Sequence, residues 1–209
     1  MSTEISKFTY MNNEKILDQE YWDKQYTSNS TGWDLGKVSP PIKEYIDTLK
    51  DKNISILIPG CGNSHEAEYL LSQGFTNITL IDIAPTLVEK LQKKFMEHPN
   101  LKIVLGDFFA HQGKYDLIIE QTFFCALLPA MRQNYVLKTH NILEEKGLLV
   151  GLLFNKTFES GPPFGGSKNE YEQLFKDYFN FKIMETCHNS IAPRANSELF
   201  IEFKRKDLK

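Results

Sequence analysis

Residues 54–64, Ile-Ser-Ile-Leu-Ile-Pro-Gly-Cys-Gly-Asn-Ser, decide the fold of this chain. The apolar run at the start has the composition of a strand buried on both faces of a parallel sheet. Pro59 ends that strand because it has no N–H for the ladder. Gly60-Cys61-Gly62 then supplies a tight turn, and Asn63-Ser64 are residue types that cap a following helix. A strand, a glycine turn and a helix N-terminus together form a site for an electron-rich or anionic group.

A carboxylate stands at the end of the next apolar strand. Asp82 follows residues 78–81 and lies twenty residues beyond Gly62. A carboxylate at this place can accept hydrogen bonds from both hydroxyls of a ribose. A dinucleotide fingerprint needs a third glycine, and that position holds His65. S-adenosylmethionine, which has a ribose and no phosphate, therefore fits better than a nicotinamide cofactor. A nicotinamide dehydrogenase and an ordinary βα turn followed by a solvated Asp82 are the alternatives.

Composition limits the classes of protein that this chain can be. At 209 residues, with 41% hydrophobic and 24% charged residues, it is expected to form one soluble globular domain. The net charge of −3 argues against a dedicated nucleic-acid binder. Three cysteines without C-x-x-C spacing predict neither a disulfide framework nor a zinc site. The N-terminus lacks the apolar core of a signal peptide, and the longest apolar stretch, residues 148–154, is too short for a bilayer. We expect a cytoplasmic protein without a metal.

Strands and helices alternate from residue 54 onward. This order predicts an α/β fold with a doubly wound, mostly parallel, seven-stranded sheet. Residues 1–50 are expected to form an N-terminal helical cover segment and residues 51–209 the cofactor-binding core of a single domain. We expect strands at residues 54–58, 78–81, 101–105, 115–119, 147–154, 181–187 and 199–204, and helices at residues 13–26, 42–49, 66–73, 85–97, 129–143 and 169–179.

Several candidate ligand contacts fall at predicted strand ends. Pro59-Gly60, Asp82, Asp107-Phe108 and Glu120-Gln121 each close one strand. Ligands of such sheets bind outside the carboxyl ends of the strands, near the switch point. The Asp107 carboxylate suits an adenine amino group, and the Phe108 backbone N–H suits a ring nitrogen. The alternative for Asp107 is a helix N-cap.

The motifs, taken together, resemble one branch of the class I S-adenosylmethionine-dependent methyltransferases, which holds thiopurine S-methyltransferase and the halide, thiocyanate and thiol methyltransferases. The similarity extends from Trp22 to Arg194, and the Pro-Gly-Cys-Gly and Phe-Phe-Cys-Ala runs look closer to the halide and thiol enzymes. The matching blocks are Tyr21-Trp22-Asp23-Lys24, Gly32-Trp33-Asp34-Leu35-Gly36, Pro59-Gly60-Cys61-Gly62, Gly106-Asp107-Phe108-Phe109, Tyr115-Asp116-Leu117-Ile118, Phe123-Phe124-Cys125-Ala126-Leu127 with Pro129 and Arg132, and Gly161-Pro162-Pro163-Phe164.

The resemblance implies S-adenosylmethionine as the cofactor, S-adenosylhomocysteine as its product, and a role for eight residues. The implied cofactor-binding residues are the aromatic cover residues Trp22, Tyr26 and Trp33, Gly60 against the methionine part, Asp82 on the ribose, Asp107 and Phe108 on the adenine side, and Gln121 after the fourth strand. For the tryptophans, a packing role is the alternative. Ile58 stands where most class I enzymes have an acid, as is usual for this branch.

The expected reaction is methyl transfer to a small soft nucleophile: a thiol, thiocyanate, a halide or a thiopurine-like thiol. Such acceptors need little or no general base, and the sequence offers neither an Asn-Pro-Pro-Tyr motif nor a compelling acid–base pair. We therefore name no catalytic residue. Arg132 and Arg194 are candidates for holding an anionic acceptor, with ion-pair or surface roles as the alternative. We expect a small-molecule partner, no nucleic acid and no membrane, and a monomer is compatible with the sequence. A methyltransferase of protein or RNA and a cofactor-binding protein without turnover are the alternatives.

Overall fold

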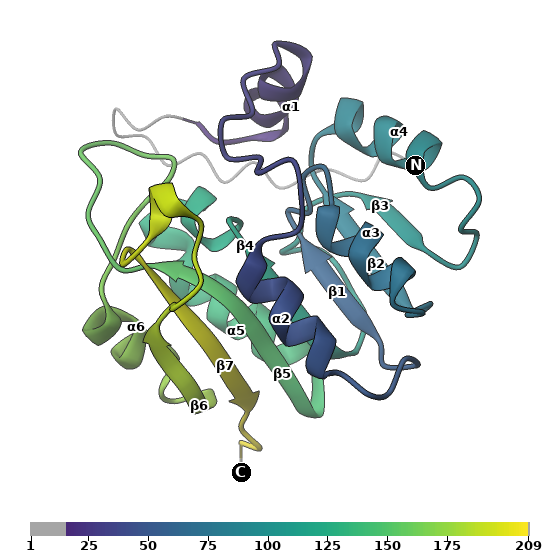
Figure 1. Cartoon of the computed structure of the whole chain (residues 1–209). Coiled ribbons are helices and arrows are strands. Elements are labelled where there is room, and N and C mark those ends of the chain that lie inside the picture. Colours follow the sequence, from purple (N-terminus) through teal and green to yellow (C-terminus); the bar gives the residue numbers. More distant parts are fainter. Residues whose placement is uncertain (1–15, 209) are drawn as a thin grey trace.

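The computed structural model describes residues 16–208, which form one seven-stranded sheet with helices on both faces (Figure 1). The predicted helix start at Asn13 lies outside the described residues. The strands are β1 (Ile56–Pro59), β2 (Ile78–Asp82), β3 (Lys102–Leu105), β4 (Tyr115–Gln121), β5 (Leu143–Phe154), β6 (Phe179–Thr186) and β7 (Glu198–Arg205). The helices are α1 (Gln19–Thr27), α2 (Pro40–Thr48), α3 (His65–Ser72), α4 (Pro85–Lys94), α5 (Arg132–Ile142) and α6 (Lys168–Phe175), and 3-10 turns lie at Phe124–Ala126 (η1), Pro129–Met131 (η2) and Ala192–Arg194 (η3).

The order of the strands across the sheet is β3-β2-β1-β4-β5-β7-β6. β7 runs antiparallel to both of its neighbours, and the other pairs of adjacent strands are parallel. The strand order reverses between β1 and β4, and this reversal is the switch point beside which doubly wound folds bind ligands. The predicted fold class is confirmed.

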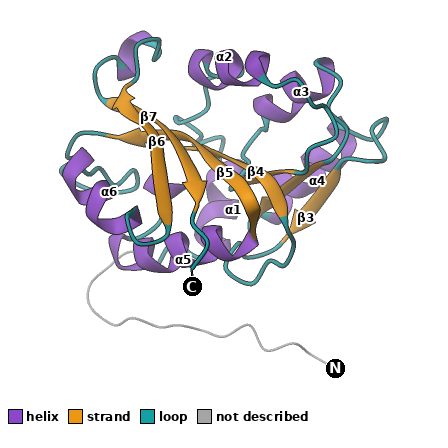
Figure 2. Cartoon of the chain, turned by 90° about the horizontal axis from the view of Figure 1, so that it is seen from below, coloured by secondary structure: helices purple, strands orange, loops and turns teal. Residues whose placement is uncertain are grey.

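Alternation along the central strands divides the core into two layers. Ile56 and Ile58 of β1 pack with α2, α3 and α4, whereas Leu57 faces the layer that contains α5 and α6. Figure 2 shows these two groups of helices on opposite faces of the sheet. Successive side chains of a strand point to opposite faces, so a continuous apolar run fills both layers.

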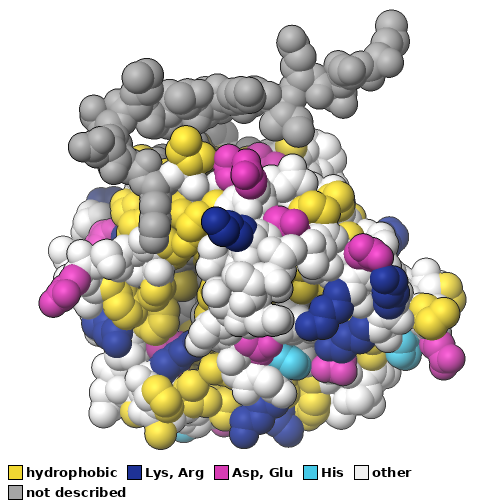
Figure 3. All heavy atoms as spheres, turned by 90° about the horizontal axis from the view of Figure 1, so that it is seen from above, with side chains coloured by type: hydrophobic (Ala, Val, Ile, Leu, Met, Phe, Trp, Pro, Cys, Tyr) yellow, Lys and Arg dark blue, Asp and Glu magenta, His cyan; other side chains and the backbone are white. Residues whose placement is uncertain are grey.

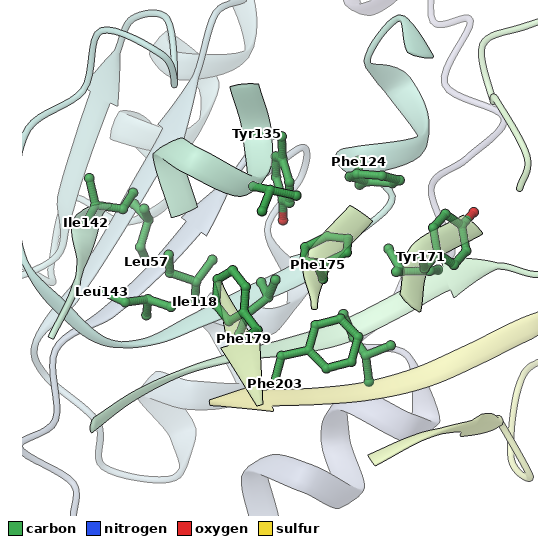
Figure 4. Packing of buried hydrophobic residues seen from close by; sticks show 14 of the residues in the cluster. Leu57, Ile118, Phe124, Tyr135, Ile142, Leu143, Tyr171, Phe175, Phe179 and Phe203 are labelled. Atoms are coloured by element: carbon green, nitrogen blue, oxygen red, sulfur yellow. The ribbon is translucent and has the colours of Figure 1, made fainter. Parts of the chain in front are cut away.

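An aromatic cluster joins the segment after β4 to α5 and α6 (Figure 4). Tyr135 lies with its ring 5.1 Å from that of Phe124, and the Phe124 ring is 5.7 Å from Tyr171. Phe175 of α6 is fully buried against the same group. Burial of each large side chain contributes roughly 1.5–3 kcal/mol. Buried aromatic contacts therefore hold the segment that follows β4 against α5 and α6.

Several helix and strand ends differ from the predicted ones, and three of them show the physical reason. The predicted helix at residues 129–143 begins with η2 and becomes α-helical at Arg132. The helix predicted to reach residue 179 ends at Phe175, because the Phe179 side chain is buried in the sheet as the first residue of β6. β5 starts at Leu143 rather than at residue 147, since Leu143 already pairs with Tyr115 before a register shift. Tertiary pairing, which local patterns do not record, decides these ends.

Candidate functional site

The turn between β1 and α3 has the tight geometry that its glycines predict. Gly60 and Gly62 have φ angles of +53° and +51°, which glycine adopts at little cost. Ser64 is the N-cap residue of α3, as its type predicts, but it has a positive φ of +53° and its side chain makes no capping hydrogen bond. A Cβ placed on Gly62 would meet, among the described residues, only the Tyr26 hydroxyl at 3.7 Å. The backbone of the turn is therefore open to a ligand on that side.

Asp82 lies at the end of β2 and points back to the glycine turn. Its Oδ2 accepts a hydrogen bond from the Gly62 N–H at 3.3 Å, and its Oδ1 accepts one from the Ala84 N–H at 3.0 Å. The side chain is only 7% exposed. Burial raises the pKa of this carboxyl, against the lowering effect of the backbone hydrogen bonds. Each oxygen keeps acceptor capacity for one further donor.

The segment after β3 approaches Asp82 from the neighbouring strand. The Gly106 N–H donates to the Asp82 backbone carbonyl at 2.9 Å. Asp107 is exposed, and its Oδ1 accepts from the Phe109 N–H at 2.8 Å, so this carboxylate caps a turn, close to the N-cap role weighed as the alternative. Phe108 is buried, with its ring 5.2 Å from that of Phe123. Only its backbone can face a ligand beside β3.

Gln121 ends β4 and is held by a residue that the sequence analysis missed. The buried hydroxyl of Ser39 donates to the Gln121 Oε1 at 3.0 Å. This bond joins the segment before α2 to the end of β4, across 82 residues of sequence. It leaves the Gln121 amide nitrogen as a donor available to a ligand at the strand ends. No local sequence signal marks Ser39 for this role.

Phe123 covers Gly60, a contact that the sequence analysis also missed. A Cβ on Gly60 would lie 2.2 Å from the Phe123 Cδ2, closer than atoms can approach. Thr122, the residue between β4 and Phe123, has a positive φ of +61°. The repeated phenylalanines after a strand end could have indicated an aromatic wall at this position.

Glu120 holds the segment that carries Phe123 in place through buried hydrogen bonds. Its side chain is 0% exposed. Glu120 Oε1 accepts from the N–H groups of Phe123 and Phe124, both at 2.8 Å, and Oε2 accepts from the Tyr135 hydroxyl at 2.7 Å. Burial raises the pKa of this carboxyl to about 7, and the three hydrogen bonds oppose that rise.

Residues 19–39, here called the cover, lie over the carboxyl ends of β1 and β2, at the top of Figure 1. The Trp33 ring is 5.7 Å from Trp22 and 5.9 Å from Tyr26, in edge contacts. Burial raises the pKa of the Tyr26 hydroxyl far above its ordinary value, and the negative charge of Asp82 adds to that effect. The hydroxyl therefore stays protonated. The three predicted aromatic residues therefore form one group beside the glycine turn.

The two arginine candidates are engaged within the protein. Arg132 is buried, forms an ion pair with Glu170 and donates to the Gly165 carbonyl at 2.7 Å. Arg194 donates to the Trp33 carbonyl at 3.0 Å and lies 3.4 Å from a Glu198 carboxylate oxygen. These contacts match the ion-pair alternative rather than a free anion-binding group.

The described residues contain no group of three or more histidine, cysteine, aspartate or glutamate side chains that could hold a metal ion. Within residues 16–208, no helix is both long and apolar enough to span a bilayer.

The fold and the arrangement at the strand ends define the class I S-adenosylmethionine-dependent methyltransferases. Among solved structures, the chain is similar to a Burkholderia thailandensis 1,6-didemethyltoxoflavin-N1-methyltransferase with bound S-adenosylhomocysteine, with a TM-score of 0.72 and 16% identity over 90% of this chain and 87% of the other. A magnesium protoporphyrin IX methyltransferase from Synechocystis with bound S-adenosylmethionine gives a TM-score of 0.65 and 14% identity over 94% and 87%. At these identities the similarity establishes the fold.

Sequence comparisons establish the family. The sequence model of the thiopurine S-methyltransferase family matches residues 17–204 of this chain. A probable thiol methyltransferase 2 of Arabidopsis thaliana is 33% identical over 88% of this chain and 84% of its own length. A thiocyanate methyltransferase 1 of Brassica oleracea is 27% identical over 97% and 90%, and a thiopurine S-methyltransferase of Vibrio campbellii is 30% identical over 87% and 94%. The chain belongs to the thiopurine S-methyltransferase family and is an S-adenosylmethionine-dependent methyltransferase, as predicted.

Proposed function

We propose that this protein transfers a methyl group from S-adenosylmethionine to a small soft nucleophile in the crevice at the carboxyl ends of β1 to β4. The acceptor class is a thiol, thiocyanate, a halide or a thiopurine-like thiol. The relatives are named for thiol, thiocyanate and thiopurine acceptors, and a halide is a soft nucleophile of the same kind. The observation that carries the proposal is Asp82. This buried carboxylate has spare acceptor capacity and stands beside an open glycine turn, under a group of aromatic side chains.

Each predicted cofactor contact has a chemical role in this proposal. Asp82 accepts hydrogen bonds from the two ribose hydroxyls, since each carboxylate oxygen has a free lone pair beyond its backbone partner. Asp107 and the Phe108 backbone N–H hold the adenine edge. The Gly60 backbone faces the methionine part while the Phe123 ring fills the space beside its Cα, and Gln121 presents its amide there.

The cofactor supplies an electrophilic methyl group on a cationic sulfonium. Trp22, Tyr26 and Trp33 stabilise that cation through their ring faces, at ~1–2 kcal/mol when water is excluded. The cover also keeps water away from the methyl group. Because the Tyr26 hydroxyl stays protonated, it serves as a neutral hydrogen-bonding group and not as a base.

The acceptor is expected to enter where the cover meets the ends of β4 and β5. Arg194 joins these parts, because it binds the Trp33 carbonyl and stacks 5.7 Å over the Phe154 ring. The Phe123 ring against Gly60 forms the opposite wall. In-line attack requires the nucleophile about 3–3.5 Å from the methyl carbon, and these walls supply position and desolvation. A thiolate or halide needs no proton transfer at pH 7, so no general base is assigned.

We also propose a small molecule as the reaction partner, with neither nucleic acid nor membrane involved. Residues 1–50 are proposed as one N-terminal helical segment, which includes the cover, on a core of residues 51–209. On the face in Figure 3, Lys and Arg side chains are interspersed with Asp and Glu, which supports the absence of a nucleic-acid surface there. The three cysteines are free and buried, which supports the reducing cytoplasm as the compartment.

Calorimetry of the wild type and of Asp82→Ala with S-adenosylhomocysteine tests the site. Two hydrogen bonds to a charged group, at ~1.5–3 kcal/mol each, predict at least ~10²-fold weaker binding in the variant. Asp116→Ala is the matched control, since Asp116 binds Ser55 at the opposite end of the sheet. Unchanged affinity of Asp82→Ala would remove this residue from the site.

Turnover separates the proposed function from binding alone. Purified protein with S-adenosylmethionine and a panel of thiols, thiocyanate and halides should release S-adenosylhomocysteine and methylated product. Thermal shifts with S-adenosylmethionine, S-adenosylhomocysteine and NAD should show stabilisation by the first two. Binding without product on any acceptor of the panel would contradict the proposed acceptor class.

A further inference from the structure

The helix of the cover packs against the core through the partly buried rings of Trp22 and Tyr26. α1 has no buried residue. Beside these contacts lies a cavity of about 240 Å³, lined by Tyr26, Asn29, Thr31, Asn63, Thr86, Leu87 and Lys90. Hydrophobic stabilisation scales with the area removed from water, so these partly buried rings contribute less than fully buried ones would. The position of α1 therefore also depends on specific polar contacts.

The first such contact is a helix cap supplied by another segment. The N-cap residue of α4 is Ala84, which has no side-chain acceptor for the free N–H groups of the first turn. Asp23 of α1 takes that place: its Oδ1 accepts from the Thr86 N–H at 2.7 Å and its Oδ2 accepts from the Thr86 hydroxyl at 3.1 Å. A carboxylate at a helix N-terminus also interacts favourably with the helix dipole.

The second contact joins the cover to the start of α3. Asp34 Oδ1 lies 2.8 Å from His65 Nε2, and Asp34 Oδ2 accepts a hydrogen bond from the Asn63 side chain. Asp34 also accepts from the Gly36 N–H at 2.8 Å, which fixes the loop that carries Trp33. Asn63 is itself held, because its Oδ1 accepts from Lys90 at 2.9 Å.

We infer that Asp23 and Asp34 are positioning residues that latch the cover onto the first turns of α4 and α3. The two carboxylates follow Trp22 and Trp33 directly, so each latch orients the tryptophan beside it over the glycine turn. This inference rests on the proposed function insofar as the cofactor lies under the cover. Neither aspartate touches the reacting atoms; each acts through the aromatic residue that it places.

Tryptophan fluorescence measures the latch directly, because the only two tryptophans in the sequence, Trp22 and Trp33, both lie in the cover. Acrylamide quenching is compared in the free wild type, Asp23→Ala, Asp34→Ala and the double variant. The matched control is Asp116→Ala, which removes the same charge at the opposite end of the sheet, where Asp116 accepts from Ser55. We expect stronger quenching in the latch variants, strongest in the double variant, and nearly wild-type quenching in the control.

Cofactor affinity measures the consequence of the latch. Hydrogen bonds to charged, half-buried groups predict roughly tenfold weaker S-adenosylhomocysteine binding for each latch variant. Asp23→Asn, which keeps an acceptor oxygen for the Thr86 N–H, should recover part of the loss. The KM for the cofactor should rise more than kcat falls, and thermal unfolding of the free variants should stay close to that of the wild type.

Two results would overturn the latch. Tryptophans that stay as protected in the double variant as in the wild type would show that other contacts hold the cover. Wild-type affinity for S-adenosylhomocysteine in both single variants would show that the latch does not position the site. Failure of the wild type to bind the cofactor would overturn the proposed function instead, and quenching of the free protein would still decide the latch.

Discussion

Replacement of Glu120 by glutamine should change how the stability of the protein depends on pH. Glutamine has nearly the same shape, so its Oε1 can still accept from the N–H groups of Phe123 and Phe124. The Tyr135 hydroxyl, which donates to Glu120 at 2.7 Å, can rotate to accept from the new amide. The substitution therefore removes a titrating group and keeps the geometry.

The expected size follows from the raised pKa of Glu120. Its carboxyl titrates at about 7 in the folded protein because of burial, against an ordinary value of 4.5. Between these values the folded state binds more protons than the unfolded state, so stability falls as pH rises. The contribution is fully present below pH 4.5 and is lost through pH 7. At about 1.4 kcal/mol per pKa unit, the loss is ~3 kcal/mol.

Urea unfolding of both proteins from pH 4.5 to 8.5 is the assay. The difference in unfolding free energy between wild type and Glu120→Gln should change by ~3 kcal/mol in favour of the variant as pH rises. Other titrating groups cancel in this difference. Tyr135 and Cys125, the titratable groups that interact with Glu120, have raised pKa values and stay neutral over this range. A difference that does not vary with pH would refute the assigned titration.

Three further changes test the site and its support. Gly60→Ala should lower the free energy of unfolding by about 1–2 kcal/mol for the positive φ, and by more because the new Cβ displaces the Phe123 ring. It should also weaken cofactor binding. Gly32→Ala, where a Cβ meets open space among the described residues, should change neither the unfolding free energy in urea nor the affinity in calorimetry. Cofactor affinity should fall as pH drops through the raised pKa of Asp82, since the protonated carboxyl loses acceptor capacity; Asp82→Asn should bind with no such pH dependence. Arg132→Met should lower the unfolding free energy by ~1–3 kcal/mol, because it leaves the Gly165 carbonyl without this donor; an unchanged urea midpoint would contradict that.

The central strands and the glycine turn could be predicted because their signals are local. Apolar runs bounded by Pro59 and Asp82 specify strands buried on both faces, and the spacing of the acid from the turn follows from one βα unit. The gathering of Gly60, Asp82 and Gln121 at one edge follows in turn, because parallel strands end on the same side of a sheet. Helix ends were less accurate, since Phe179 leaves the predicted helix to pack in β6.

By itself, the sequence determined the fold class, the family and the edge of the sheet at which we propose the cofactor site, because periodicity, turn chemistry and ordered motifs act over short stretches of chain. Only the tertiary structure decided which of the 27 acidic residues are buried and what they hold. Nothing near Glu120 marks it as the acid that fixes the wall beside Gly60, and nothing near Asp34 marks its partner on α3. The Glu120 contacts reach only as far as Tyr135, 15 residues away, whereas Asp34 with Asn63 and Ser39 with Gln121 join segments 29 and 82 residues apart. Such pairs exist only once packing has brought the segments together and removed water from between them.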